Sequence, residues 1–178
     1  MKAAAMSLRD ERIGVFIDGA SLQQAAKLVN LVIDYKRILM LFRQHGRVIR
    51  ATYYATVVRE QNVCTVRPLL DWLSYNGFTV VAKAMRSNVE HAGNLRVEIA
   101  VDAMQLADSL DHLILFTGDR ELCPLVAAVQ QRGKRVSVIS TLRGEPAVLA
   151  DELRRQADQF LELESLRQIL CREDRMVP

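Results

Sequence analysis

The sequence predicts an α/β protein, a three-layer α/β/α sandwich around a mostly parallel sheet of about five strands. Short segments rich in β-branched and aromatic residues alternate with segments whose apolar residues recur at helical spacing. The strand segments are apolar on both faces, which is typical of a parallel sheet covered by helices on each side. No linker, repeat or low-complexity segment interrupts this alternation, so we expect one domain.

The individual elements follow from these two patterns in chain order. Five strands are expected, at residues 12–17, 47–57, 78–84, 112–117 and 135–140. Between them, helical spacing predicts helices around residues 22–29, 38–42, 66–73, 99–107 and 125–129. Gly46, Gly77 and Gly133 each fall where a helix gives way to the next strand, a position that favours a left-handed residue.

Length and the C-terminal pattern complete the expected organisation. A chain of 178 residues that is 50% hydrophobic suits one globular domain with a sizeable core. From residue 146 onward, apolar residues at helical spacing, Phe160 among them, predict further helix packed on the same core. We expect a flexible N-terminal segment over residues 1–11, the domain over 12–163, and a C-terminal helix and tail over 164–178.

Charge and cysteine content limit the classes of function. A formal charge of +3 and a pI near 8.9 permit an anionic partner without requiring one. The sequence contains neither the apolar core of a signal peptide nor a run of roughly 18 apolar residues, so no membrane partner is expected. Three widely spaced cysteines favour reduced thiols and a cytoplasmic location. No glycine-rich nucleotide loop follows any strand, which argues against a nucleotide cofactor.

Two aspartates follow directly on expected strands. Asp18 and Asp119 each lie one step beyond a strand's carboxyl end, at Phe-Ile-Asp-Gly and Thr-Gly-Asp. In an open parallel sheet, ligands bind at the carboxyl ends of the strands, beside the point where strand order reverses. If these two strands are neighbours across that point, the two carboxylates converge. The adjacent Gly19 and Gly118 are expected to let the backbone turn sharply there.

Three further acids extend this pair. Glu121 follows Asp119 by two residues, while Glu98 and Asp102 are four apart on an expected helix and so share one face. Carboxylates that lie close together repel one another unless a cation compensates them, and hard oxygen ligands favour Mg²⁺ or Mn²⁺. Such a metal polarises a phosphoryl oxygen and activates a water molecule.

Each acid also has a purely structural interpretation. An aspartate between a strand and a helix is often only an N-cap or turn residue, which applies to Asp18 and to Asp119. Glu98 and Asp102 could equally form a solvated helix face that pairs with Arg96 or with lysines. The combination of four acids from three elements at the functional edge favours the metal site.

The motifs around these acids are RIGVFIDGASL, VEIAVDAMQLAD, LFTGDRELCPLV and LRRQADQFLEL. They resemble successive blocks of the NYN domain family in its bacterial LabA-like branch, which is related to PIN-domain nucleases. The resemblance spans about residues 12–163. It implies a PIN-like fold and an Mg²⁺- or Mn²⁺-dependent ribonuclease that hydrolyses RNA phosphodiester bonds with a metal-activated water. Asp18, Asp102 and Asp119 coincide with the family's catalytic, metal-binding acids, and Glu98 and Glu121 are further candidate ligands.

Three positions depart from the family pattern. Ser21 stands where the family usually has asparagine, Arg96 stands where an acid is expected, and Glu121 replaces an aspartate. Glu98 could replace the lost acid, whereas Arg96 would weaken metal binding or contact a phosphate. A second hypothesis is therefore a catalytically weakened NYN domain that acts as an RNA-binding or protein-interaction regulator.

Polar and basic residues near the acids are the candidates for substrate binding. They are Ser21, Lys83, Arg86, Arg96 and Arg120. The segment 85–94 is the most polar connection and a natural lip of the cleft, and Tyr53 or Tyr54 could offer a stacking face to a base. The alternative is that these cations serve solubility alone.

The histidines, one cysteine and the tryptophan are not assigned to the candidate site. The histidines His45, His91 and His112 are interpreted as surface or turn residues, and Cys123 as a small buried apolar residue. A homodimer is an open hypothesis, for which Trp72 is an exposed apolar candidate.

Overall fold

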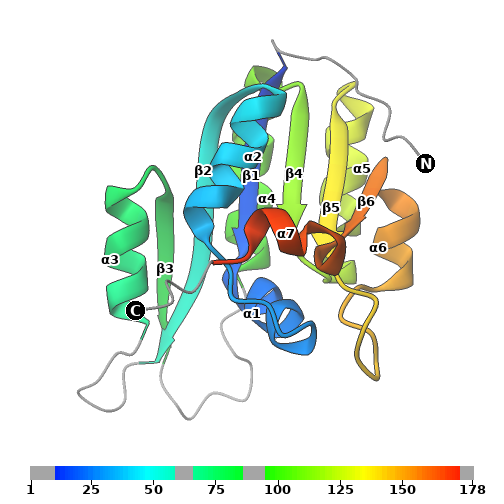
Figure 1. The fold of residues 1–178 in the computed structure, drawn as a ribbon. Coiled ribbons are helices and arrows are strands. Elements are labelled where there is room, and N and C mark those ends of the chain that lie inside the picture. The colour runs from blue at the N-terminus through cyan, green and yellow to red at the C-terminus, as the bar shows by residue number, and fades with distance from the viewer. Residues whose placement is uncertain (1–10, 59–65, 86–94, 173–178) are drawn as a thin grey trace, which may run out of the picture.

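A computed structural model describes residues 11–58, 66–85 and 95–172 and shows one six-stranded parallel sheet (Figure 1). The strand order is β3-β2-β1-β4-β5-β6. The bounds are β1 Arg12–Asp18, β2 Arg47–Val58, β3 Thr79–Met85, β4 His112–Phe116, β5 Arg135–Ser140 and β6 Gln159–Glu162. The expected N-terminal segment 1–11 lies almost wholly outside the described residues, as does the end of the expected tail.

Helices cover both faces of the sheet, as the three-layer prediction requires. The longer helices are α1 Gly19–Leu28, α2 Tyr35–His45, α3 Arg67–Tyr75, α4 Arg96–Leu106 and α5 Cys123–Gln131. Shorter ones are α6 Asp151–Gln156, α7 Arg167–Leu170, and the 3₁₀ turns η1 Ala107–Ser109, η2 Arg120–Leu122 and η3 Leu163–Leu166. The first three helices and α7 share one core, and α4, α5 and α6 share the other.

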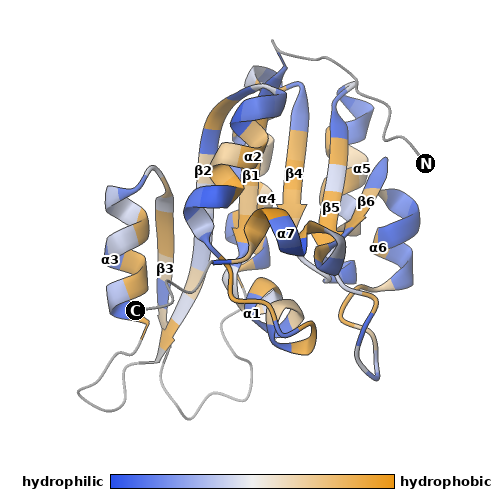
Figure 2. Cartoon of the chain, in the orientation of Figure 1, coloured by the Kyte–Doolittle hydropathy of each residue, from blue (hydrophilic) through white to orange (hydrophobic). Residues whose placement is uncertain are grey.

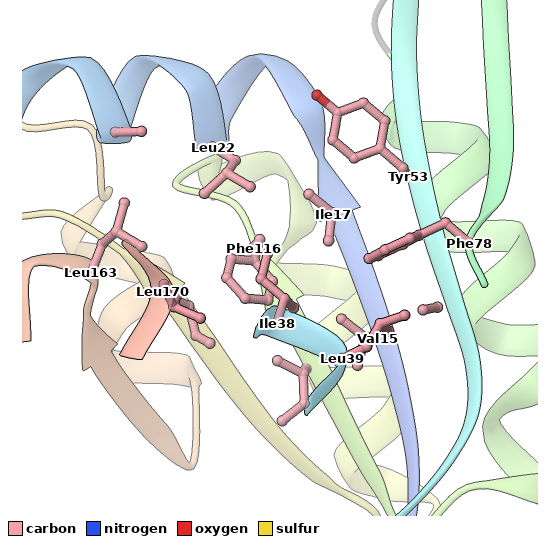
Figure 3. Packing of buried hydrophobic residues seen from close by; sticks show 14 of the residues in the cluster. Val15, Ile17, Leu22, Ile38, Leu39, Tyr53, Phe78, Phe116, Leu163 and Leu170 are labelled. Atoms are coloured by element: carbon pink, nitrogen blue, oxygen red, sulfur yellow. The ribbon is translucent and has the colours of Figure 1, made fainter. Parts of the chain in front are cut away.

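The two cores follow from the alternation of side chains along each strand. In β1, Val15 and Ile17 enter the first core, whereas Phe16 enters the second. The central strands are therefore apolar on both sides, while most helices mix polar and apolar residues (Figure 2). Figure 3 shows the first core, where Leu22 and Ile38 pack around the aromatic ring of Phe116. Continuous apolar strands of this kind are typical of a parallel sheet that is covered by helices on both faces.

The direction of strand addition reverses beside β1. From β1 the chain adds β2 and β3 on one side, and it then returns to place β4, β5 and β6 on the other. β1 pairs in parallel with both β2 and β4. Their carboxyl ends form the crevice where an open α/β sheet binds its ligands, so the predicted neighbourhood of the first and fourth strands is confirmed.

The sheet differs from the prediction at its C-terminal edge. Phe160 was expected on a helix, but helix α6 ends when Ala157 adopts an extended conformation, and β6 then pairs with β5. The side chain of Asp158 fixes this change, because it accepts a hydrogen bond from the backbone N–H of Val136 at 2.7 Å. The apolar residues that the sequence places at helical spacing thus belong to a short helix followed by a strand.

Two of the three glycine predictions are confirmed. Gly77 and Gly133 have φ values of 92° and 72°, in the left-handed region. The prediction for Gly46 is wrong, since its φ of 178° is ordinary extended backbone. Lack of space favours glycine here instead, because a Cβ atom at position 46 would overlap the carbonyl oxygen of Glu11.

His112 is another correction, because it lies in the interior at the start of β4 and not at the surface. Only 7% of the residue is exposed, and its Nε2 atom lies 2.7 Å from the hydroxyl of Ser137. Arg135 approaches the other ring nitrogen at 3.1 Å and also pairs with the carboxylate of Glu11. These residues form a polar cluster at the amino edge of the sheet, opposite the crevice, and we call it the His112 cluster.

Within the described residues, no helix is both long and apolar enough to cross a bilayer. His45 is exposed, as predicted, and His91 lies outside the described residues. Cys123 is half-buried, and burial raises the pKa of its thiol. Trp72 is 40% exposed on α3, which leaves the homodimer a prediction.

Candidate active site

Asp18 ends β1 and also caps helix α1, so the N-cap interpretation of this residue is correct. Its Oδ1 atom accepts a hydrogen bond from the backbone N–H of Ser21 at 3.3 Å. Its Oδ2 atom accepts one from the Ser21 hydroxyl at 2.7 Å. Ser21 therefore orients the carboxylate of Asp18, a role different from the substrate contact that the sequence suggested. A capped aspartate keeps further lone pairs for another ligand.

Asp119 caps the 3₁₀ turn that follows β4. Its Oδ1 atom accepts a hydrogen bond from the N–H of Glu121 at 3.0 Å, and its own N–H donates to the hydroxyl of Thr117 at 3.2 Å. The same hydroxyl lies 3.5 Å from the Oδ2 atom of Asp18. Thr117 is buried between the two strand ends, so it links the two aspartates that the sequence placed at this edge.

The two aspartates line one pocket of about 410 Å³. Residues from three elements add further polar groups to its lining, namely Ser21 and Gln24 from α1, Tyr54 and Thr56 from β2, and Arg96 from the start of α4. The pocket therefore lies at the switch point, over the carboxyl ends of β1, β2 and β4.

Arg96 pairs with two acids of the loop after β4. Its Nε atom donates to the Oδ2 atom of Asp119, and its Nη1 atom donates to Glu121 at 2.5 Å. One guanidinium group thus bridges two carboxylates through different nitrogens. The positive charge predicted beside the site is present, and it neutralises the acids nearest to it.

Asp102 is joined to the floor of the pocket by Tyr54. The buried phenol of Tyr54 donates a hydrogen bond of 2.9 Å to the Oδ2 atom of Asp102. Tyr54 is also in register with Asp18 across β1 and β2. Burial, together with the nearby carboxylate, raises the pKa of Tyr54 well above its usual value, so the hydroxyl stays a donor.

The predicted aromatic stacking face is wrong. Tyr53 and Tyr54 point to opposite faces of the sheet, and helices cover both faces, so each residue is no more than 1% exposed. The ring of Tyr54 stacks instead on Phe16, at 6.4 Å between centroids. Sequence reasoning missed the role of the Tyr54 hydroxyl because it depends on strand register.

Lys83 and Glu98 bind each other instead of lining the pocket. The Lys83 Nζ atom lies 2.7 Å from Oε1 of Glu98 and lowers the pKa of that carboxyl group. The second oxygen, Oε2, is buried and accepts no hydrogen bond from any described residue. Arg120 is exposed beside Asp119. Arg86 and nearly all of the predicted lip 85–94 lie outside the described residues.

The glycines beside the two aspartates allow close packing and do not form left-handed turns. A Cβ atom at Gly19 would lie 2.6 Å from the Tyr53 hydroxyl. A Cβ atom at Gly118 would overlap the carbonyl oxygen of Val148, in the loop that follows β5. The Gly118 carbonyl in turn accepts a hydrogen bond of 2.9 Å from the N–H of Ala150. Neither glycine has a positive φ, yet β1 gives way directly to α1 between Asp18 and Gly19.

The residue types at the pocket fit a hard divalent cation, since carboxylate oxygens are its preferred ligands. Within residues 11–58, 66–85 and 95–172, however, no three acidic, histidine or cysteine side chains are grouped closely enough to hold one. The contacts explain this, because Asp119 is turned toward Arg96 and Asp102 toward Tyr54. The carboxylates are therefore suitable metal ligands, but the guanidinium group of Arg96 is hydrogen-bonded to one of them, Asp119.

The fold and this edge define an α/β protein with a carboxylate-lined pocket at its switch point. Residues 12–164 match the NYN domain family, and the chain belongs to that family, which confirms the resemblance seen in the sequence. It is 25% identical over 183 residues to the low amplitude and bright protein LabA of Synechococcus elongatus, covering 97% of this chain and 95% of that protein.

The fold itself has a counterpart among solved structures. A protein from Vibrio parahaemolyticus, described as of unknown function, matches with a TM-score of 0.72 and 24% identity. The match covers 92% of this chain and 96% of that one. At this level of identity, the likeness supports the α/β/α architecture alone.

Proposed function

We propose that this protein is a metal-dependent ribonuclease that hydrolyses RNA phosphodiester bonds in the pocket between β1, β4 and α4. The observation that carries the proposal is the convergence of Asp18 and Asp119 on Thr117, at the switch point of an NYN fold. Family membership supports a nucleic-acid ligand, and the relationship to PIN-like nucleases supports RNA as the substrate. Asp18, Asp102 and Asp119 are the proposed catalytic acids.

Mg²⁺ or Mn²⁺ is the cofactor that these acids suit. Asp18, Asp102 and Asp119 would hold it, with Glu121 and Glu98 as further candidate ligands. Glu98 offers an observation in favour, because its Oε2 atom has no hydrogen-bond partner among the described residues. When bound, the cation would polarise a phosphoryl oxygen of the substrate and lower the pKa of a water molecule.

The chain's own groups would prepare the pocket for a phosphodiester. Ser21 fixes the rotation of the Asp18 carboxylate, and Tyr54 fixes that of Asp102. These two carboxylates are therefore restrained before a ligand arrives, which lowers the entropic cost of assembling the reacting groups. The guanidinium of Arg96 supplies a planar pair of donors that suits a phosphate, and Arg120 and Lys83 stay candidates for weaker contacts.

The proposed setting is the cytoplasm, with single-stranded or structured RNA as the partner. Cys123 and Cys171 are both free thiols, and a reducing compartment keeps thiols in that state. The homodimer through the exposed face of Trp72 stays a separate prediction.

A second candidate function is an RNA-binding or protein-interaction regulator with weakened catalysis. The observation that favours it is the ion pair of Arg96 with Asp119 and Glu121, which compensates carboxylates that a metal would otherwise use. In that case RNA binds to the protein but is not cleaved.

Incubation of the purified protein with Mn²⁺ and with single-stranded and hairpin RNA tests the first proposal. We expect cleavage, and we expect Asp119→Asn to slow it about hundredfold or more. Asp108→Asn is the matched control, because this exposed acid pairs with Arg132 outside the pocket. We expect this variant to cleave RNA at the wild-type rate. RNA binding without cleavage of either RNA would favour the regulator, and wild-type cleavage by Asp119→Asn would refute the proposed site.

A further inference from the structure

We propose that Arg96 couples RNA binding to metal binding. In the free protein its guanidinium compensates Asp119 and Glu121, and when RNA enters, the guanidinium transfers to a backbone phosphate and leaves the Asp119 carboxylate for a divalent cation. This inference rests on the proposed function, because it concerns the order in which the same pocket acquires its ligands.

The contacts of Asp119 support a competition between Arg96 and a cation. One carboxylate oxygen of Asp119 receives the N–H of Glu121, and the other receives Nε of Arg96. Both oxygens therefore already have a donor. A divalent cation at Asp119 would also lie beside a guanidinium of like charge, which disfavours simultaneous occupation.

The position of Arg96 supports its exchange onto RNA. Among the described residues that line the pocket, Arg96 is the one cation, so an entering phosphate meets no other positive side chain there. Lys83 does not line this pocket and is held by Glu98. In the free protein the guanidinium makes one hydrogen bond to each of two carboxylates, whereas a single phosphate can accept two parallel hydrogen bonds from it.

The exposure of the pair is compatible with a reversible change of partner. The side chain of Arg96 is 34% exposed and that of Glu121 57%, and ion pairs of such exposure are weak. Asp119, at 19%, is better shielded. Because Arg96 is the first residue of α4, its side chain can change partner while the helix stays in place.

Reciprocal linkage gives the expected result a definite form. A phosphate ligand that removes Arg96 from Asp119 must strengthen metal binding, and the metal must strengthen phosphate binding by the same factor. Without RNA, removal of the Arg96 charge should by itself strengthen metal binding at Asp119.

The test measures Mn²⁺ affinity by titration calorimetry, with and without a 2′-O-methyl phosphorothioate oligonucleotide that resists cleavage. We expect Arg96→Gln to bind Mn²⁺ about tenfold more tightly than the wild type in the absence of oligonucleotide. The oligonucleotide should tighten Mn²⁺ binding about tenfold in the wild type and by a much smaller factor in Arg96→Gln. For the titration without oligonucleotide, Arg120→Gln is the control, because it removes the same charge next to Asp119 from an exposed arginine.

Three outcomes decide against the inference in different ways. If Arg96→Gln leaves Mn²⁺ affinity unchanged while Asp119→Asn abolishes binding, the coupling is refuted and the proposed function stands. If Arg120→Gln strengthens binding as much as Arg96→Gln, the effect is general charge and the specific exchange is refuted. If no Mn²⁺ binding depends on Asp119 in either background, the metal-dependent function itself fails.

Discussion

Replacement of His112 by glutamine tests whether the buried His112 cluster makes the fold sensitive to acid. Burial and then the positive charge of Arg135 lower the pKa of His112 to about 4, from an ordinary value of 6.5. The neutral ring contacts the hydroxyl of Ser137 at 2.7 Å. Glutamine keeps a polar group for this contact and removes the titration.

The sign and size of the effect follow from proton linkage. Above pH 6.5 the histidine is neutral in both the folded and the unfolded chain, so its titration contributes nothing to stability. Between pH 6.5 and 4 the unfolded chain takes up a proton that the folded chain excludes, and the free energy of unfolding falls. At pH 4.5 we expect the loss to be roughly 2–3 kcal/mol, and well below pH 4 it levels off at roughly 3 kcal/mol.

Urea unfolding followed by circular dichroism at pH 7 and at pH 4.5 measures this loss. The wild type should lose roughly 2–3 kcal/mol more than His112→Gln between the two pH values. Glu11 and Asp111 are also present in both proteins near this edge. The Glu11 Oε2 atom lies 3.4 Å from Nδ1 of His112, so the substitution also removes the coupling between these two groups, and the measured difference includes it. Equal losses in the two proteins, or a His112 titration midpoint near 6.5 by NMR, would refute the reasoning.

Two further substitutions test the supports of the pocket. Gly118→Ala should lower the free energy of unfolding by about 2 kcal/mol, because the added methyl group would overlap the Val148 carbonyl and push apart the two loops. Urea unfolding measures this loss, and an unchanged midpoint would contradict the close contact. Tyr54→Phe removes the donor to Asp102 and should lower stability by about 2 kcal/mol without changing the fold. Chemical unfolding checks this second prediction, and a wild-type stability would show that the hydrogen bond contributes nothing.

The sequence was sufficient to predict most of the fold because the strands are apolar on both faces and the helices on one. Only a parallel sheet covered on each side buries both patterns. The C-terminal edge escaped prediction because β6 has four residues, and its apolar Phe160 and Leu161 also continue the spacing of the preceding helix. Pairing with β5 decides that this segment is a strand and not a helix, and such a tertiary contact cannot be read from the local sequence pattern.

The site divides in the same way. Asp18 and Asp119 could be predicted to lie together because parallel strands end at one edge and neighbouring strands flank the switch point. The bond of Asp102 to Tyr54 depends on the register of β2 against β1 and on how α4 lies over both. The pairing of Arg96 depends on the orientation of a long side chain. The sequence predicts that the charge of Arg96 lies near the acids, but it does not predict which acids Arg96 pairs with.

The link between the two strand ends also determines when the pocket can exist during synthesis. Asp18 and Thr117 are 99 positions apart in the chain and meet only once β1 has paired with β4. A nascent chain that has not yet delivered β4 beyond the ribosome holds its first aspartate with no counterpart, however well its early helices have formed. The pocket is thus complete only after most of the domain has been synthesised.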